Sequence, residues 1–228
     1  MNPENDFSEA VEDYLKAIFD LEQGGKNITT NQIAAQLAVK PASVTSMLKK
    51  LAAFEPPLVD YHKHRGVRLT EAGKKAALRT VRQHRLIEQF LVQVMGYSWD
   101  EVHEEADHME HAISPKFEER MATILGEPSY DPHGDPIPGP DLSLPSNITI
   151  PLAQLPAGQT ATVRRVLSSD SALLRYLGTL GIHPDARLTL LAQVPYDHTL
   201  RVRVAGQDQE QVLGAELGAR ILVESPAA

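Results

Sequence analysis

Residues 33–51, IAAQLAVKPASVTSMLKKL, decide how the first part of the chain folds, because they hold two helical segments separated by a short break. Apolar residues recur with helical spacing on each side of the break at residues 39–41. Thr29-Thr30 supplies a cap for the first segment, and Pro41 suits the first turn of the second. A helix, a tight turn and a second helix make a helix-turn-helix, which is the arrangement we predict here.

The segments on either side extend this motif. Upstream, residues 7–23 place apolar side chains on one side with helical spacing, and Gly24-Gly25 ends that helix. Downstream, residues 58–70 alternate apolar and polar side chains around a basic turn from His62 to Gly66, which predicts a β-hairpin. A hairpin directly behind a helix-turn-helix is the arrangement called a winged helix.

Charge is distributed very unevenly along the chain. The net charge is −8, yet residues 40–85 carry eleven lysines and arginines against three acids. A basic block within an acidic chain is the electrostatic footprint of a DNA-binding segment. We expect DNA contacts from the second helix of the motif and from the hairpin tip, through Lys40, Ala42, Ser43, Thr45, Ser46, Lys49, Lys50, Lys63 and Arg65. A helix-turn-helix also occurs as plain packing, and a basic helix is often only solvated, so this alternative stays open.

A second pattern lies in the middle of the chain, where helices are expected at about 71–95, 99–112 and 115–125. His103, Asp107, Glu110 and His111 are spaced i, i+4, i+7 and i+8, which puts all four on one face of a helix. A face made of imidazoles and carboxylates is not an apolar core stripe.

His84 and Glu88 repeat the i, i+4 arrangement on the preceding helix. Imidazoles and carboxylates are ligands for a divalent cation of borderline or hard character. The chain has no cysteine, so any metal must be held by nitrogen and oxygen donors. The ordinary alternative is an acidic, solvated helix face that happens to include histidines.

The last part of the chain has a different character. Residues 127–146 hold six of the 16 prolines, which predicts a linker or an ordered extended segment. From Ile148 onward, short β-like runs surround one short helix near residues 171–181, which predicts a small all-β, barrel-like module. The N-terminus shows no basic and apolar leader, and no run approaches the ~18 apolar residues of a membrane helix. We therefore expect a soluble, cytoplasmic protein.

Several of these motifs together resemble one family. The resemblance is carried by VEDYLKAIFDLEQ, IAAQLAVKPASVTSMLKKL with the wing behind it, HRLIEQFL, VHEEADHMEHAIS and DPHGDPIPG. In this order they are similar to the diphtheria-toxin-repressor and manganese-transport-regulator (DtxR/MntR) metalloregulators, from about residue 7 to 140. The remaining C-terminal residues look like the SH3-like, FeoA-type module of longer family members, which is a weaker match.

The resemblance implies a winged helix-turn-helix DNA-binding domain at 1–72, a helical metal-binding and dimerisation domain at 73–140 with a proline-rich linker from about 127, and an SH3-like domain at 147–226. The implied fold class is mainly α, with a small all-β SH3-like barrel at the C-terminus. The implied function is a homodimer whose binding to double-stranded operator DNA is favoured by a divalent metal, as a repressor of metal-uptake genes. No enzyme activity is expected.

The resemblance also implies the metal ligands, which are Asp13, Asp107, Glu110 and His111 in a primary site and His84, Glu88 and His103 in an ancillary site, with Asp170 reaching in from the SH3-like module. Iron-responsive members carry methionine and cysteine at the positions of Asp13 and Asp107, whereas manganese-type members carry carboxylates, so Mn²⁺ is the expected metal. Lys16 stands where manganese-type members usually have a glutamate. This departure speaks against a two-metal cluster and leaves Fe²⁺ as the alternative. Asp170 alternatively caps the helix that begins near Ser171.

The expected mechanism rests on charge. Without metal, Asp13 should be repelled by Asp107 and Glu110, and a bridging cation should then fix the DNA-reading module. One competing function is a di-metal oxidase or hydrolase, because Glu105-x-x-His108 resembles the ligand pair of such enzymes, but the chain offers no second pair in that order. The other is a regulator whose acidic helices dimerise and bind an organic effector.

Overall fold

The computed structural model describes residues 7–24, 27–62, 66–146 and 148–224. The chain forms two compact units. The first unit comprises the chain up to residue 84 with residues 109–119 and 138–143, and the second comprises 85–108, 120–137 and 144 onward. No helix within these described ranges is long and apolar enough to cross a membrane. The three predicted domains stay predictions.

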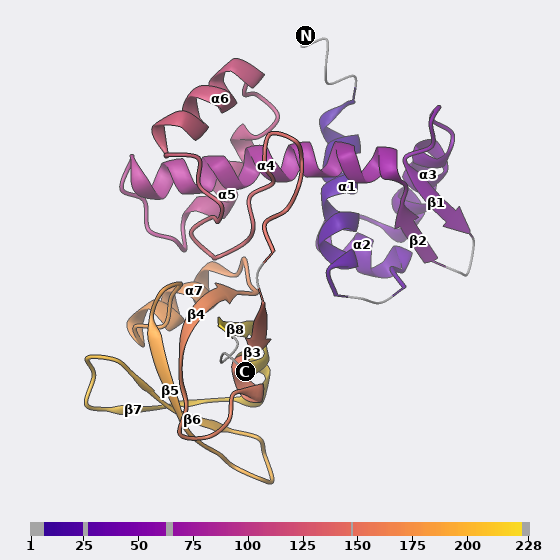
Figure 1. The fold of residues 1–228 in the computed structure, drawn as a ribbon. Helices are drawn as coiled ribbons and strands as arrows, with labels where there is room; N and C mark the ends of the chain where they lie inside the picture. Colours follow the sequence, from indigo (N-terminus) through magenta and orange to yellow (C-terminus); the bar gives the residue numbers. More distant parts are fainter. Residues whose placement is uncertain (1–6, 25–26, 63–65, 147, 225–228) are drawn as a thin grey trace. The chain divides into compact units, whose positions relative to one another are not determined.

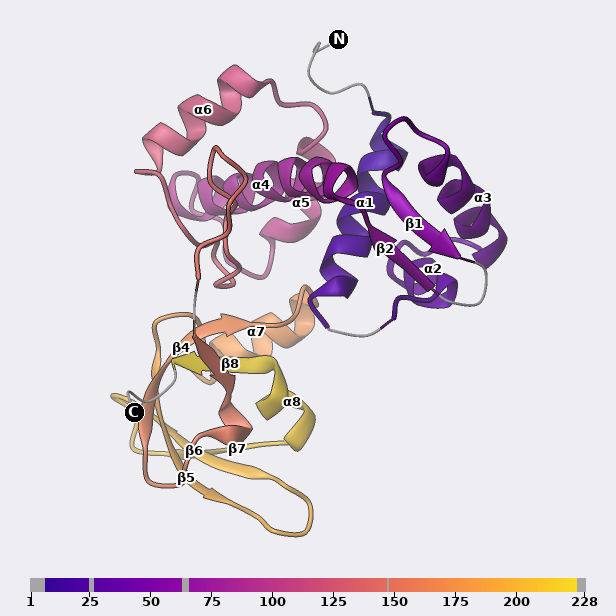
Figure 2. The same ribbon diagram turned by 45° about the vertical axis from the view of Figure 1, so that its right-hand side comes forward.

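The first unit contains the predicted winged helix (Figures 1 and 2). Its elements are α1 (Glu9–Glu22), α2 (Thr30–Gln36), α3 (Pro41–Ala52), β1 (Val59–His62), β2 (Gly66–Leu69) and the first half of α4 (Glu71–Gln93). The two strands pair antiparallel, from Val59 opposite Leu69 to His62 opposite Gly66. Helix α1 contacts α2 and β2, and α3 contacts α2 and β1, so the hairpin lies directly behind the helix-turn-helix.

Local sequence signals explain where these helices begin. Thr29 and Gln32 form a capping box: the Thr29 hydroxyl accepts from the Gln32 N–H at 3.3 Å, and the Gln32 side chain accepts from the Thr29 N–H at 2.9 Å. Pro41 occupies the first turn of α3, as predicted. The predicted apolar faces are buried, with Val11, Leu15, Ile18 and Phe19 on α1 and Val44, Leu48 and Leu51 on α3. These side chains form one core with the hairpin.

The second unit combines helical segments with a six-stranded antiparallel sheet. It contains the second half of α4, most of α5 (Val102–Met109) and the end of α6 (Pro115–Ile124), followed by β3 (Thr149–Pro151), η1 (Leu152–Gln154), β4 (Thr160–Val166), α7 (Ser171–Thr179), β5 (Arg187–Gln193), β6 (Leu200–Val204), β7 (Glu210–Leu213), α8 (Ala215–Arg220) and β8 (Ile221–Glu224). The strand order is β3-β8-β4-β5-β6-β7. Leu174 and Leu177 of α7 pack into the core of the sheet, and Trp99 packs against that core.

The sheet is open, which corrects the prediction of a barrel. Within the described residues, β3 and β7 are the two edges and do not pair with each other. Strand β3 has only three residues and ends at Pro151, which has no N–H to extend a ladder. The apolar face is covered by α7 instead of by closure of the sheet. The SH3-like description of this module stays a prediction.

The helix predicted to run to Ala112 is shorter, and this changes how two candidate ligands are held. Helix α5 ends at Met109, and the N–H of Ala112 bonds to the Met109 carbonyl at 2.9 Å. Glu110 and His111 therefore lie in the turn after the helix. Pro115 begins α6, and the residue before a proline avoids the helical conformation, so the chain must leave the helix here. The prediction that one continuous helical face carries all four ligands is wrong.

The proline-rich stretch is ordered around residues 130–137, the second of the two alternatives predicted for it. Tyr130 forms a bridge with Pro136, and Ile137 is buried. The Asp131 carboxylate accepts the N–H groups of His133 at 2.8 Å and of Asp135 at 2.9 Å. An aspartate that binds the backbone two residues on stabilises a turn, which explains how this segment holds its shape.

Gly134 is the position in this segment where a side chain should do most harm. Its φ is +85°, and a Cβ there would lie 1.8 Å from the carbonyl oxygen of Arg164 in β4. We expect Gly134→Ala to lower the free energy of unfolding by more than about 3 kcal/mol, because the backbone of β4 must move. Gly126→Ala is a matched control, since φ is +76° but nothing lies within 4 Å of the added Cβ. Only the left-handed conformation opposes that alanine, at about 1–2 kcal/mol. Urea unfolding of both variants measures the difference, and equal losses would contradict the expectation.

Candidate metal centre

Three of the four residues predicted for the primary site meet within the first unit. Asp13 comes from α1, and Glu110 and His111 come from the turn after α5; one ligand atom of each lies within 4.8 Å of the others. His111 Nε2 is 2.8 Å from Asp13 Oδ1 and 3.5 Å from Glu110 Oε1. The side chain of Glu110 is 1% exposed and that of Asp13 is 44% exposed. Glu110 is therefore buried, whereas Asp13, which comes from the first helix of the winged-helix unit, is accessible to solvent.

Glu12 belongs to this site, although sequence reasoning missed it. It is 5% exposed, and its Oε2 lies 2.6 Å from Nδ1 of His111. The contact leaves Nε2, the other ring nitrogen, facing Asp13. Carboxylates commonly orient ligating imidazoles in this way. Its position beside Asp13 was the only signal in the sequence, because its partner is 99 residues away.

Positive charge is already present among these acids. Hydrogen bonds with Asp13 and then with Glu12 raise the pKa of His111 to about 10, against the opposing effect of burial. A cation that takes Nε2 must displace this proton. The expected repulsion between Asp13 and Glu110 is therefore offset in the metal-free chain by the positive charge on His111.

Lys16 supplies a second positive charge. Its Nζ lies 2.7 Å from each oxygen of Glu110 and 3.2 Å from Nδ1 of His84. The same His84 nitrogen is 2.5 Å from Glu110 Oε2. The ammonium group therefore contacts the same oxygen and nitrogen atoms that a second metal ion beside the primary site would need as ligands. This geometry agrees with the expectation that Lys16 opposes a two-metal cluster.

A pocket of about 540 Å³ adjoins the proposed primary site. Its lining includes Glu12, Gln83, Glu110 and His111. Gln83 Oε1 is buried and finds no hydrogen-bond partner in the described part of the chain. A buried polar atom without a partner is uncommon and indicates a missing ion or water. An amide oxygen also suits a hard cation or its bound water. The donor set here, mainly carboxylate oxygen with one imidazole, fits a divalent metal ion.

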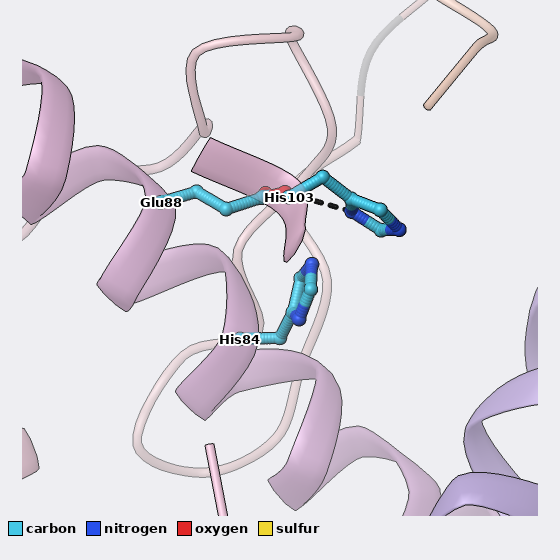
Figure 3. A group of neighbouring side chains, drawn as sticks. All are labelled: His84, Glu88 and His103. Atoms are coloured by element: carbon cyan, nitrogen blue, oxygen red, sulfur yellow. Dashed lines mark hydrogen bonds and ion pairs between the residues drawn. The ribbon is translucent and has the colours of Figure 1, made fainter. Parts of the chain in front are cut away.

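The three residues predicted for the ancillary site also come together. His84 and Glu88 are one turn apart on α4, His103 is on α5, and one ligand atom of each lies within 4.8 Å of the others. Glu88 Oε1 is 3.1 Å from Nδ1 of His103. Figure 3 shows the two imidazoles and the carboxylate converging on a common space. His84 and Glu88 are buried, whereas the His103 side chain is 34% exposed.

The remaining two predicted ligands are placed differently. Asp107 Oδ2 lies 3.8 Å from Nε2 of His103, and its side chain is 48% exposed. Among the described residues, the group that contains Asp13, Glu110 and His111 does not include Asp107.

Asp170 is the N-cap of α7. Its Oδ1 accepts the N–H groups of Ala172 at 2.9 Å and of Leu173 at 3.1 Å. The capping alternative is therefore confirmed. No ligand group found among the described residues includes Asp170.

A third group, which the sequence did not reveal, is formed by Glu88, Asp131 and His133 in the second unit. All three residues are buried. Burial, and then the charges of Asp135 and Glu88, raise the pKa of Asp131 well above its ordinary value. Burial lowers the pKa of His133, but the hydrogen bond and charge attraction to Glu88, the charge of Asp131 and the hydrogen bond to Trp99 together raise it to about 9. Arg85 Nε lies 3.7 Å from Asp131 Oδ2, so a guanidinium group already faces this carboxylate.

The predicted DNA-contacting face of α3 is available. Lys40, Ala42, Ser43, Ser46, Lys49 and Lys50 are exposed and Thr45 is half-buried. The Thr45 hydroxyl donates to the Pro41 carbonyl at 3.1 Å, which leaves its methyl group and its free lone pairs for a base edge. Lys63 and Arg65 lie outside the described residues. The assignment of these nine residues to DNA contacts stays a prediction.

Three family profiles match successive parts of the chain. Residues 6–67 match the family profile described as iron dependent repressor, N-terminal DNA binding domain. Residues 70–139 match the profile described as iron dependent repressor, metal binding and dimerisation domain, and residues 150–225 match the FeoA domain. The chain is 34% identical to the iron-dependent repressor IdeR of Mycobacterium leprae over 198 residues, which are 82% of this chain and 85% of that protein.

Solved structures are also similar to this chain over most of its length. A manganese-dependent transcriptional repressor in complex with manganese is 38% identical, with a TM-score of 0.87 over 95% of this chain and all of that chain. The structure of ScaR with bound Zn²⁺ is 35% identical, with a TM-score of 0.80 over 95% of this chain and 99% of that chain. These relatives are transcriptional repressors and not enzymes. On this evidence of sequence, fold and site geometry, the chain belongs to the DtxR/MntR family of metal-dependent transcriptional repressors.

Proposed function

We propose that this chain is a homodimeric, Mn²⁺-activated repressor that binds operators of metal-uptake genes in the cytoplasm, with Fe²⁺ as the second candidate metal. One observation carries the proposal. Asp13, on the first helix of the winged-helix unit, meets Glu110 and His111 from the region that matches the metal-binding and dimerisation profile. A cation at this group ties the DNA-reading helices to the dimerisation region.

The donor set supports Mn²⁺. Asp13 and Glu110 offer carboxylate oxygens, Gln83 offers a buried amide oxygen beside them, and His111 adds one imidazole. Oxygen-rich sets of this kind suit Mn²⁺, whereas thiolate and thioether ligands favour softer ions. Fe²⁺ remains the second candidate because manganese and iron both occur in the names of the relatives.

The chain's own residues define the switch. A bound metal ion would supply positive charge for the carboxylates of Asp13 and Glu110, which would hold it together with His111. His111 would have to be deprotonated at Nε2 to act as a ligand, and the contact with Glu12 at Nδ1 would keep the ring in its orientation. DNA binding is favoured to the extent that the DNA-competent arrangement holds the metal more tightly than the free one does.

Lys16 sets how strongly metal is bound, because its ammonium competes for Glu110. We expect Lys16→Met to raise the Mn²⁺ affinity of the primary site about 10-fold, since the buried carboxylate then lacks a cation. Competition against a fluorescent chelator measures this affinity. Lys75→Met, at an exposed position on α4, is the matched control and should change nothing. An unchanged or weaker affinity in Lys16→Met would contradict the competing role.

The test of metal identity is fluorescence anisotropy with a duplex selected from a random pool in the presence of Mn²⁺. Metal-stripped protein is titrated with Mn²⁺, anaerobic Fe²⁺, Zn²⁺ and Mg²⁺. The proposal predicts tight binding with Mn²⁺ at low micromolar concentration and none with Mg²⁺. Activation by Fe²⁺ at lower concentration than Mn²⁺ would assign the chain to iron instead.

A further inference from the structure

Gln83, on α4, carries a buried amide oxygen that has no hydrogen-bond partner among the described residues. The residue as a whole is 8% exposed. Proteins rarely leave a buried polar atom without a hydrogen bond, because its lost contacts with water are then not replaced. The oxygen therefore indicates a hydrogen-bond donor that the described part of the chain does not supply.

The surroundings of Gln83 overlap with the proposed primary site. Gln83 lines the pocket of about 540 Å³ together with Glu110 and His111. The next residue of α4, His84, places its Nδ1 2.5 Å from Oε2 of Glu110, so this turn of the helix contacts a proposed metal ligand. The pocket is many times larger than the ~30 Å³ that one water occupies in the liquid. Water molecules therefore have room between Gln83 and the proposed ligands.

The proposed primary site offers fewer ligand atoms than Mn²⁺ takes. Asp13, Glu110 and His111 supply one ligand atom each. Mn²⁺ prefers octahedral geometry with about six ligands, so about three positions are left, or about two if Asp107 binds as predicted from the sequence. Water fills the positions that side chains leave. A metal-bound water is a strong hydrogen-bond donor, because the cation draws charge from its oxygen, and it needs an acceptor nearby.

Other buried acceptors that line the pocket are already engaged. Both oxygens of Glu110 lie 2.7 Å from Nζ of Lys16, and Oε2 of Glu12 lies 2.6 Å from Nδ1 of His111. The amide oxygen of Gln83 is therefore the acceptor best placed to receive a hydrogen bond from water in this pocket.

An ordinary buried water, present with and without metal, is the competing interpretation of the same oxygen. Such a water stabilises the fold and has no preference for one metal over another. A water bound to the metal makes a different prediction, because its number depends on which ion is bound. Zn²⁺ is typically four-coordinate, so three protein ligands leave it about one position for water, against about three for Mn²⁺.

We propose that Gln83 is a specificity-determining residue: its Oε1 accepts a hydrogen bond from a water bound to the metal of the primary site, and this contact favours Mn²⁺ over Zn²⁺. The inference rests on the proposed function, because it requires a metal ion at Asp13, Glu110 and His111. Groups that contact metal ligands without binding the metal typically change affinity about 10- to 100-fold when removed. The ion that keeps more water gains more from Gln83.

The test uses the full chain carrying Glu88→Gln, because Glu88 belongs to two of the other groups of candidate ligands. In this background Gln83→Leu removes the amide, and Gln83→Glu keeps an oxygen acceptor. Competition with a fluorescent chelator measures the affinities. We expect Gln83→Leu to lower Mn²⁺ affinity at least about 10-fold and Zn²⁺ affinity less than about threefold. Gln83→Glu should bind Mn²⁺ no more than about threefold more weakly than the parent chain.

Gln93→Leu is the matched control, because Gln93 is an exposed glutamine of the same helix. It should change neither affinity. Thermal unfolding without metal shows whether each variant is folded. If Gln83→Leu does not fold, Gln83→Met carries the same expectation, since it also lacks the acceptor but has a flexible side chain.

Relaxation of solvent protons by bound Mn²⁺ gives a second readout, because it reports water in direct contact with the ion. We expect bound water in the parent chain and faster exchange of that water in Gln83→Leu, whose hydrogen bond is lost. Absence of water on Mn²⁺ in the parent chain, or equal losses of Mn²⁺ and Zn²⁺ affinity in Gln83→Leu, would overturn the proposal. If the parent chain bound no Mn²⁺ at all, the primary site itself would be refuted before any change at Gln83.

Discussion

We expect Asp13→Ala to remove the metal dependence of DNA binding. With saturating Mn²⁺, we expect the variant to bind operator DNA no more tightly than metal-stripped wild-type protein, which is a loss of about 100-fold for a coupling of typical size. The physical reason is that Asp13 is the proposed ligand on α1, so without it a cation at Glu110 and His111 no longer ties down the DNA-reading helices. Fluorescence anisotropy with a labelled duplex measures the effect.

The control for this variant is Asp20→Ala, which removes the same charge from the same helix away from the metal group. It should retain metal-dependent binding. Thermal unfolding without metal should show both variants folded. Full Mn²⁺-dependent DNA binding by Asp13→Ala would contradict the assignment of the primary site.

Ser46→Glu should abolish DNA binding while leaving metal binding intact. Ser46 is exposed on α3, on the face that also carries Lys49 and Lys50. A carboxylate placed there meets the phosphates of DNA, and like charges at an interface cost several kcal/mol, so we expect a loss of at least about 100-fold. DNA affinity is measured by anisotropy and Mn²⁺ affinity by chelator competition on the same preparation.

Ser46→Ala is the matched control. It removes the hydroxyl without adding charge, and we expect DNA affinity to change by less than about 10-fold, the cost of one base or phosphate contact. If Ser46→Glu bound DNA as tightly as the wild-type chain, α3 would not be the helix that faces DNA. The prediction separates DNA reading from metal sensing, because α3 contributes no residue to the ligand groups.

Sequence alone predicted the winged helix well, because its signals are local. Helical spacing, the cap at Thr29 and Pro41 at the first turn of α3 each act within one or two turns. Capping of α7 was one of the two roles predicted for Asp170. It is also a local signal, because the side chain accepts N–H groups only two and three residues ahead.

Features that depend on distant partners were not predictable in this way. Glu12 contacts a histidine 99 residues away, and His133 faces a helix that precedes it by some forty positions in the printed sequence. Nothing in the local pattern distinguishes either from an ordinary acid or a linker histidine. The open edges of the sheet likewise follow from which strands pair with which, and the spacing of apolar residues does not encode that pairing.

The candidate ligands fall between these extremes. The i, i+4 pair His84 and Glu88 was read correctly as one face of α4, because α4 is continuous there. The run from His103 was extended too far, since α5 ends at Met109 and a turn carries Glu110 and His111. The assignment of these residues as ligands stays a prediction, whereas the continuous helix expected to hold them was wrong.

The balance of charge around Asp13 could be established only from the structure. The sequence predicts repulsion among the acids near Asp13, but the folded chain places the imidazolium of His111 and the ammonium of Lys16 among them. The metal-free state is therefore already neutralised in part. In the proposed switch a metal ion would take the place of these cations, and we therefore expect Lys16 to influence metal affinity.

The most direct test of the account is the affinity for Mn²⁺ measured with and without operator DNA on the wild-type chain. Linkage requires that if metal tightens DNA binding, DNA tightens metal binding by the same factor. We predict that saturating operator DNA raises Mn²⁺ affinity by the factor by which Mn²⁺ raises DNA affinity, about 100-fold. Equal Mn²⁺ affinity in the presence and absence of DNA would show that the metal does not control DNA binding and would contradict the account.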